Sequence, residues 1–143
     1  MTLGDLAALR RQITRHEGVR LKPYRCTAGK LTIGIGRNLE DRGITAEEAA
    51  MLLDNDITET IGALSQRFDW FDELSPVRQM VLVDMCFNLG MGGLLKFKRF
   101  LGAVSRHEYE AAAQEMLASK WAKQVGQRAL RLATMLESGL LCQ

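Results

Sequence analysis

The chain is poor in the residues that mark several protein classes. Its 143 residues include two prolines and 13 glycines, which excludes collagen-like and proline-rich sequences. Aromatic residues make up only 6%, and the alternation of β-branched residues that is typical of an all-β fold is missing. Hydrophobic residues reach 47% and charged residues 25%, as in ordinary globular proteins, which excludes wholesale disorder. We therefore expect a mainly helical globular chain of one or at most two small domains.

Cysteine is also scarce, and its three copies are far apart in the sequence. The odd number excludes a complete disulfide framework, and no CxxC pair provides the usual spacing of a zinc site. Reduced thiols in a cytoplasm are the simplest interpretation. No apolar run approaches the roughly 18 residues of a transmembrane helix, and the N-terminus lacks the features of a secretory signal. We therefore expect neither stable membrane insertion nor secretion.

No single sign of charge dominates, since the formal net charge is +2. The charge is nevertheless unevenly distributed, with +5 on residues 1–44, −7 on residues 45–93 and +4 on residues 94–143. Two basic ends around an acidic middle suggest an anionic partner, although a solvated surface explains the same pattern. Nucleic acid is not expected, because no dense basic run is interleaved with aromatic residues.

The spacing of apolar residues predicts helices around one small β region. Leu6, Leu9 and Ile13 indicate an amphipathic helix over 3–16. Residues 19–38 are interrupted by proline and glycine and predict a β-hairpin with its turn at 27–30. Capping signals at Thr45 and at Ser75-Pro76 begin two further helices, the first reaching about residue 66 and the second apolar almost all round until a run of glycines. Three more helices are expected over 95–104, 106–118 and 127–137.

The predicted fold class is α+β and mostly helical. A small α+β lobe over 13–44 precedes a connecting helix over 45–66 and an all-helical lobe over 67–143, within one domain that covers 1–143. We expect the N-terminal helix to pack on the helical lobe, and a ligand site in a cleft between lobes.

Glu17, Cys26 and Thr32 are the residues that first suggest chemistry. A hairpin that folds back on the first helix would present Cys26 and Thr32 towards Glu17. A carboxyl acid, an opposing polar group and a hydroxyl that holds water are the groups needed to hydrolyse a glycosidic bond. Such spacing alone is weak, so a helix-end carboxylate, a buried filler thiol and a strand-favouring threonine remain alternatives.

The surrounding sequence is more specific. Residues 17–36 read EGVRLKPYRCTAGKLTIGIG and contain the spacing E-x8-(D/C)-x5-T, with cysteine at the middle place. In these residues the chain resembles phage-type lysozymes (endolysins) of glycoside hydrolase family 24, and is T-even phage lysozyme-like. The resemblance covers roughly residues 5–139. It continues, in the same order along the chain, at residues 43–45, 75–90, 119–121 and 127–129.

The resemblance implies a lysozyme-like fold and roles for individual residues. Glu17 matches the general acid, Cys26 the position that aligns or activates the hydrolytic water, and Thr32 the hydroxyl that holds this water. The basic residues near Cys26 in sequence would favour its thiolate if the fold brings any of them close. Substrate-binding positions are expected at Gly36, Asn88, Trp121 and Arg128.

Three of these assignments leave alternatives open. Asn88 and Trp121 are equally consistent with packing residues. Arg128 matches a residue near the catalytic glutamate, but His16 stands where the T-even enzyme has an acid, so the ion pairing of Arg128 is not defined by the resemblance.

The implied activity is that of a muramidase, which cleaves the β-1,4 bond between N-acetylmuramic acid and N-acetylglucosamine in peptidoglycan and so lyses the host cell. No metal or organic cofactor is implied. We expect a monomer that accumulates in the host cytoplasm and reaches the wall with the help of a separate membrane-permeabilising protein. The alternative, favoured by cysteine in place of aspartate at position 26, is a catalytically weak wall-binding relative with a structural or spike-associated role.

Overall fold

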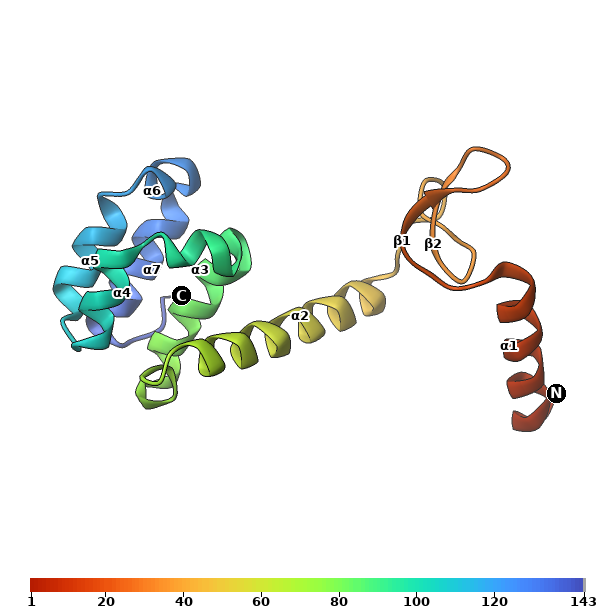
Figure 1. Cartoon of the computed structure of the whole chain (residues 1–143), viewed down its shortest axis with the longest axis horizontal. Coiled ribbons are helices and arrows are strands. Elements are labelled where there is room, and N and C mark those ends of the chain that lie inside the picture. Colours follow the sequence, from red (N-terminus) through yellow and green to blue (C-terminus); the bar gives the residue numbers. More distant parts are fainter. Residues whose placement is uncertain (143) are drawn as a thin grey trace. The chain divides into compact units, whose positions relative to one another are not determined.

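The computed structural model describes residues 1–142, so the domain predicted over 1–143 ends on one residue outside this range. The chain divides into two compact units, Met1–Met51 and Leu52–Gln143 (Figure 1). The described residues form seven α-helices, one short 3-10 helix and one antiparallel sheet of three strands. This composition of elements confirms the predicted fold class. The lobe boundaries and the packing of the N-terminal helix on the helical lobe stay predictions.

The first unit begins with helix α1 (Leu3–Glu17), which Thr2 caps. The Asp5 N–H donates to Thr2 Oγ1 at 3.1 Å, and the Thr2 N–H donates to Asp5 Oδ2 at 2.7 Å. This reciprocal pair satisfies backbone groups that the first turn of a helix leaves unbonded. The predicted helix is confirmed to within one residue at its C-terminal end, which places Glu17 where the chain leaves the helix.

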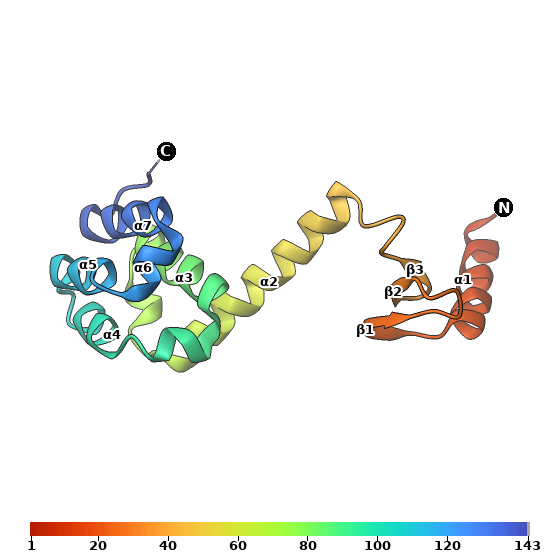
Figure 2. The ribbon, with the colours of Figure 1, turned by 90° about the horizontal axis from the view of Figure 1, so that it is seen from above.

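The predicted β region is confirmed as three strands (Figure 2), which are β1 (Arg20–Arg25), β2 (Leu31–Gly34) and β3 (Arg37–Asn38). They pair in chain order, so that β2 is central. Thr32 of β2 lies opposite Tyr24 on one side and Asn38 on the other. This central position explains why Thr32 is only 4% exposed in so small a sheet.

Helix α2 (Ala46–Arg67) begins at the predicted capping box. The Glu48 N–H donates to Thr45 Oγ1 at 3.1 Å, and the Thr45 N–H donates to Glu48 Oε1 at 2.9 Å. Arg37 of β3 reaches the same carboxylate, with its Nη2 2.8 Å from Glu48 Oε2. This guanidinium is the main reason that the pKa of Glu48 falls to about 2, and the Thr45 N–H contributes further. The ion pair joins the sheet to the first turn of α2.

The second unit is helical around one apolar core. The N-terminus of α3 is capped by Ser75, whose Oγ accepts from the Arg78 N–H, as predicted. The helices α5 and α7 lie side by side in this unit, as Figure 1 shows. After α2 the elements are η1 (Phe71–Glu73), α3 (Pro76–Leu95), α4 (Lys98–Ser105), α5 (Tyr109–Leu117), α6 (Lys120–Val125) and α7 (Gln127–Ser138). Fully buried core residues include Leu64, Val81, Leu82, Met85, Leu94, Val104, Met116 and Leu136.

Three helix predictions in this unit need correction. The helix from Pro76 was expected to end at the glycines, but it breaks at Gly90, which has a φ of 73° and a ψ of 164°, and resumes as far as Leu95. The six-residue helix α6 was not predicted. The apolar stretch 80–89 was expected to be a central buried helix, but it is buried on one side only. Val81, Leu82 and Met85 are fully buried and Cys86 is 6% exposed, whereas Met80 and Phe87 are each 46% exposed.

The described residues, 1–142, contain no single helix long and apolar enough to cross a membrane. Helices α3 and α4 have the necessary length and composition only as a pair, and the pair is bent by 106°.

Candidate active site

Glu17, the predicted general acid, lies against Gly36 in the turn between β2 and β3. A Cβ at Gly36 would lie 2.7 Å from Glu17 Oε2 and 2.9 Å from Glu17 Cδ, closer than real side chains approach. Gly36 also has a φ of 70°, which residues with a Cβ rarely adopt. The backbone therefore favours glycine here, and any side chain at this position would displace the carboxylate beside it. Contact of Gly36 with substrate stays a prediction. The partial burial expected to keep the general acid protonated is not found, because Glu17 is exposed.

Cys26 begins the tight turn between β1 and β2. The Gly29 N–H donates to the Cys26 carbonyl at 2.8 Å, and the Cys26 N–H donates to the Lys30 carbonyl at 3.0 Å. Gly29 has a φ of 77°, as expected for the residue that follows a type I turn in a short hairpin loop. The predicted hairpin turn is confirmed, and two backbone hydrogen bonds fix Cys26 within it.

Thr32 meets Cys26 at the same carbonyl oxygen. Its Oγ1 donates to the Lys30 carbonyl at 2.8 Å, the oxygen that also accepts from the Cys26 N–H. Since this bond uses the only hydroxyl hydrogen, the Thr32 oxygen keeps lone pairs that can accept from a water molecule. The structure thus brings Cys26 and Thr32 together around one backbone group.

The environment of the Cys26 thiol favours the thiolate through the backbone of this turn. Hydrogen bonds from the backbone N–H groups of Lys30 and then Ala28 lower the pKa of Cys26, while burial acts in the opposite direction. The basic side chains nearby in sequence are not the cause. Arg20 lies over the ring of Tyr24 at 4.4 Å, and Arg25 and Lys30 engage acids.

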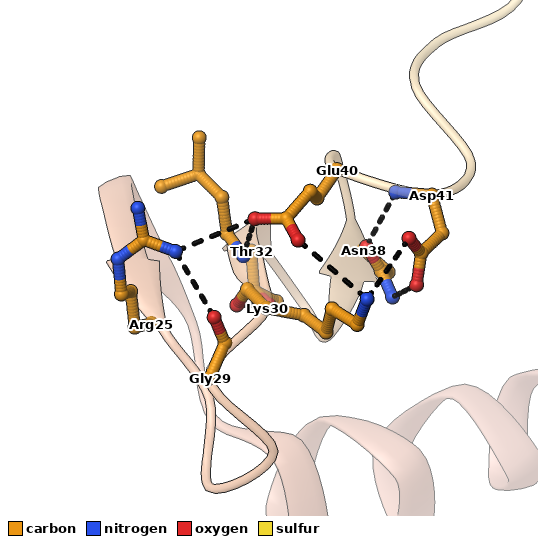
Figure 3. A network of polar contacts seen from close by, with 8 residues as sticks. Arg25, Gly29, Lys30, Thr32, Asn38, Glu40 and Asp41 are labelled. Atoms are coloured by element: carbon orange, nitrogen blue, oxygen red, sulfur yellow. Dashed lines mark hydrogen bonds and ion pairs between the residues drawn. The ribbon is translucent and has the colours of Figure 1, made fainter.

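Those acids are Glu40 and Asp41, directly after β3 (Figure 3). Arg25 Nη1 lies 3.3 Å from Glu40 Oε1, and Lys30 Nζ lies 3.6 Å from Glu40 Oε2 and 3.3 Å from Asp41 Oδ1. Asn38 fixes Asp41 in turn, because its Nδ2 donates to Asp41 Oδ2 at 3.1 Å and its Oδ1 accepts from the Asp41 N–H at 3.0 Å. Neither acid was predicted from the sequence, in which their position after a basic hairpin is the only signal.

Arg128, predicted to bind substrate, pairs with Asp84 within the second unit. Its Nε donates to Asp84 Oδ1 at 2.7 Å, and its Nη2 donates to the Asp84 carbonyl at 3.3 Å. Both side chains line a mainly apolar cavity of about 590 Å³ formed with residues of α2 and α3. The resemblance left the ion pairing of Arg128 open. In the structure Arg128 pairs with Asp84, which belongs to the same unit. Asp84 was missed, although a single acid within the apolar stretch 80–89 was a usable signal.

Asn88 and Trp121, the other predicted substrate residues, are bonded to each other. Trp121 Nε1 donates to Asn88 Oδ1 at 2.7 Å. Trp121 is 5% exposed and its ring meets that of Phe97 edge to face, with centroids 6.1 Å apart. This geometry gives Trp121 a packing role, while the exposed Asn88 keeps the two donors of its amide nitrogen for other partners. Contact of either residue with substrate stays a prediction.

The first unit therefore gathers the groups suited to hydrolysis with acid assistance. It carries a carboxyl group beside Gly36, and a thiol and a hydroxyl around the Lys30 carbonyl. Within residues 1–142, no group of three or more His, Cys, Asp or Glu side chains is placed to hold a metal ion.

Comparison with known proteins identifies the family. The sequence model described as phage lysozyme matches residues 14–135. An endolysin of Acyrthosiphon pisum secondary endosymbiont phage 1 is 31% identical, over 78% of this chain and 75% of its own. The probable T4-type lysozyme 1 of Dictyostelium discoideum is 26% identical, over 95% of this chain and 97% of its own. The pre-baseplate central spike protein Gp5 of Enterobacteria phage T4 is 29% identical over 90% of this chain, which corresponds to 27% of the spike protein.

The family match contains every predicted site residue, from Glu17 at the end of α1 to Arg128 in α7. The small three-stranded sheet, the long helix α2 and the helical second unit agree with the fold that the resemblance implies. The chain therefore belongs to the phage lysozyme family and is, at the level of that family, a lysozyme-type glycoside hydrolase.

Proposed function

We propose that the chain is a muramidase that hydrolyses the β-1,4 bond between N-acetylmuramic acid and N-acetylglucosamine in peptidoglycan. The observation that carries the proposal is the pairing of Cys26 with Thr32 at the Lys30 carbonyl, in the same unit that holds Glu17 against Gly36. These are the residues at which the chain has the family spacing of acid, water-positioning group and hydroxyl.

In the proposed reaction, protonated Glu17 donates its proton to the glycosidic oxygen of the leaving sugar. A water molecule is held by hydrogen bonds to the Cys26 sulfur and the Thr32 hydroxyl oxygen. It attacks the anomeric carbon from the opposite face. Departure of the leaving sugar as an alcohol and addition of this water give an inverted product. The Cys26 environment supports the step, because a lowered pKa increases the fraction of thiolate at neutral pH, and the thiolate can accept the proton that the attacking water loses.

The proposed biological role is lysis of the host cell by an endolysin. The chain would accumulate in the host cytoplasm, act as a monomer without cofactor, nucleic acid or stable membrane insertion, and reach the wall after a separate protein has permeabilised the membrane. The basic residues of 1–44 and 94–143 suit a wall whose peptide stems carry carboxylates.

The test is a clearing assay on Gram-negative cells stripped of their outer membrane, combined with mass spectrometry of the released fragments. We expect clearing and fragments with reducing N-acetylmuramic acid ends. The Glu17→Gln variant keeps the shape of the side chain but cannot donate the proton, so its activity should fall by about 10²- to 10⁴-fold while the fold survives. Clearing at the parental rate by folded Glu17→Gln protein would refute the assigned acid.

A second candidate is a wall-binding module with weak activity and a structural or spike-associated role. The observations that favour it are the similarity to a phage spike protein and the cysteine at position 26. The same assay separates the two candidates, because a weakly active module would clear cells slowly and release few fragments, and its binding can be checked by sedimentation with purified wall.

A further inference from the structure

The contacts of Glu40 converge on both ends of the turn that carries Cys26. Arg25 precedes the turn and donates to Glu40 Oε1 at 3.3 Å, while Lys30 closes the turn and lies 3.6 Å from Glu40 Oε2. The Leu31 N–H, one residue further, points to Glu40 Oε1 at 3.4 Å. Figure 3 shows the carboxylate between the Arg25 and Lys30 side chains. One side chain thus bridges the two strand ends between which the turn is formed.

These contacts extend into the turn itself. The Nη1 of Arg25 that reaches Glu40 also donates to the Gly29 carbonyl at 3.0 Å. Glu40 is therefore connected through Arg25 to the middle of the turn and through Lys30 to its end. The Lys30 carbonyl in turn accepts from the Cys26 N–H and from the Thr32 hydroxyl. A displacement of Lys30 would consequently move the bonds that fix both residues.

Stability is a poor explanation for this arrangement. The side chains of Arg25, Lys30 and Glu40 are 65, 41 and 43% exposed, and exposed ion pairs of this kind contribute little to the free energy of unfolding. What the arrangement does restrict is geometry, because three groups at the two ends of the turn are held relative to a single carboxylate: the Arg25 and Lys30 side chains and the Leu31 N–H. A catalytic group that aligns water needs such restriction more than a fold does.

We propose that Glu40 is a positioning residue for the hydrolysis, which holds the Cys26–Lys30 turn through Arg25 and Lys30 and so fixes the Cys26 thiol and the Thr32 hydroxyl relative to each other. The inference rests on the proposed function of this site. Asp41 assists only at the Lys30 end, since its single contact with the turn is the 3.3 Å pair with Lys30 Nζ.

The first test compares Glu40→Gln with Glu108→Gln. Glu108 forms an exposed ion pair with Arg106 at 3.1 Å in the second unit, so its replacement removes a bond of the same kind elsewhere. We expect kcat of wall hydrolysis to fall about 10- to 100-fold in Glu40→Gln with KM nearly unchanged, because misplacement of a catalytic group by about 1 Å costs of this order. Glu108→Gln should keep the parental kcat, and both variants should keep the parental Tm. A parental kcat for Glu40→Gln overturns the inference.

A double-mutant cycle tests the route of the effect. If Glu40 acts through the two cations, Glu40→Gln should lower kcat no further in a protein that already carries Arg25→Gln and Lys30→Gln. Additive losses would overturn the proposed connection.

A third measurement is independent of activity. Amide hydrogen exchange of Cys26 and Gly29 reports the two hydrogen bonds that close the turn. We expect faster exchange at both amides in Glu40→Gln but not in Glu108→Gln, and unchanged exchange overturns the inference. If the parent protein hydrolyses no wall, the proposed function fails by itself, whereas faster exchange in Glu40→Gln alone still supports Glu40 as the residue that holds the turn.

Discussion

Replacement of Gly36 by alanine should disable the proposed acid with little further damage to the fold. The added Cβ would lie 2.7 Å from Glu17 Oε2, so the carboxylate must withdraw by about 0.7 Å to reach an ordinary contact distance. This movement costs little stability, because Glu17 is exposed and the end of its side chain is free to rotate. For a catalytic group it is serious, since a misplacement near 1 Å lowers the rate by about 10²-fold. We therefore expect kcat in the clearing assay to fall by roughly 10- to 100-fold in Gly36→Ala.

Gly34→Ala is the matched control for this prediction. Gly34 has a φ of 71°, against 70° for Gly36, so an alanine at either position carries the same backbone strain of about 1–2 kcal/mol. A Cβ at Gly34, however, would meet no atom of residues 1–142 within 4 Å. Both variants should therefore lose a similar amount of Tm in thermal unfolding, and only Gly36→Ala should lose its activity. Equal activity of the two folded variants would refute the argument that Gly36 positions Glu17.

Two further predictions concern the thiol and the pH dependence of stability. Cys26→Ala should lower clearing by at least about 10²-fold in a folded protein, whereas Cys26→Asp should stay active, because it supplies the carboxylate found at this place in other family members. Alkylation of Cys26, followed by mass spectrometry, should set in at a lower pH than for an ordinary thiol, since the backbone of its turn lowers its pKa. Glu48 has a pKa of about 2 in the folded protein against 4.5 without its partners, so it contributes stability above pH 4.5 that is lost as the pH falls towards 2. Glu48→Gln should remove this part of the pH dependence of Tm. The control Glu47→Gln, which replaces the neighbouring acid, should keep the parental dependence of Tm on pH. A parental dependence in Glu48→Gln would contradict the role of the ion pair with Arg37.

Local signals in the sequence were sufficient for most helices and for the hairpin. Thr45 and Ser75 could be read as caps because a cap and its partner are three residues apart, and both bonds are present in the structure. Helix α6 escaped because six residues are too few to show an apolar period. Gly90 was read as a stop, whereas burial of Leu94 at 0% exposure explains why the helix resumes after the break.

The contacts that define the site depend on tertiary structure and could not be predicted in the same way. Arg128 and Asp84 are 44 residues apart, and Arg25 and Glu40 are 15 apart, so no sequence period relates them. The sequence pattern around Cys26 placed the thiol in a turn. It could not show which groups shift the pKa of this thiol, because that depends on the partner with which each nearby basic side chain pairs. Those partners were set by the strand register, which brings the segment after β3 beside the β1–β2 turn.

The hydrogen bond between Trp121 and Asn88 gives the second unit an intrinsic optical reporter. The chain has two tryptophans, and Trp70, which stacks on Phe68 with centroids 4.7 Å apart, can be replaced by phenylalanine to leave Trp121 as the only indole. The emission of a buried indole depends on what its Nε1–H donates to, and here the acceptor belongs to an exposed side chain. Any ligand that draws the Asn88 amide towards itself therefore changes the fluorescence of a ring that the ligand never touches, so occupancy at Asn88 can be read from unlabelled protein in solution.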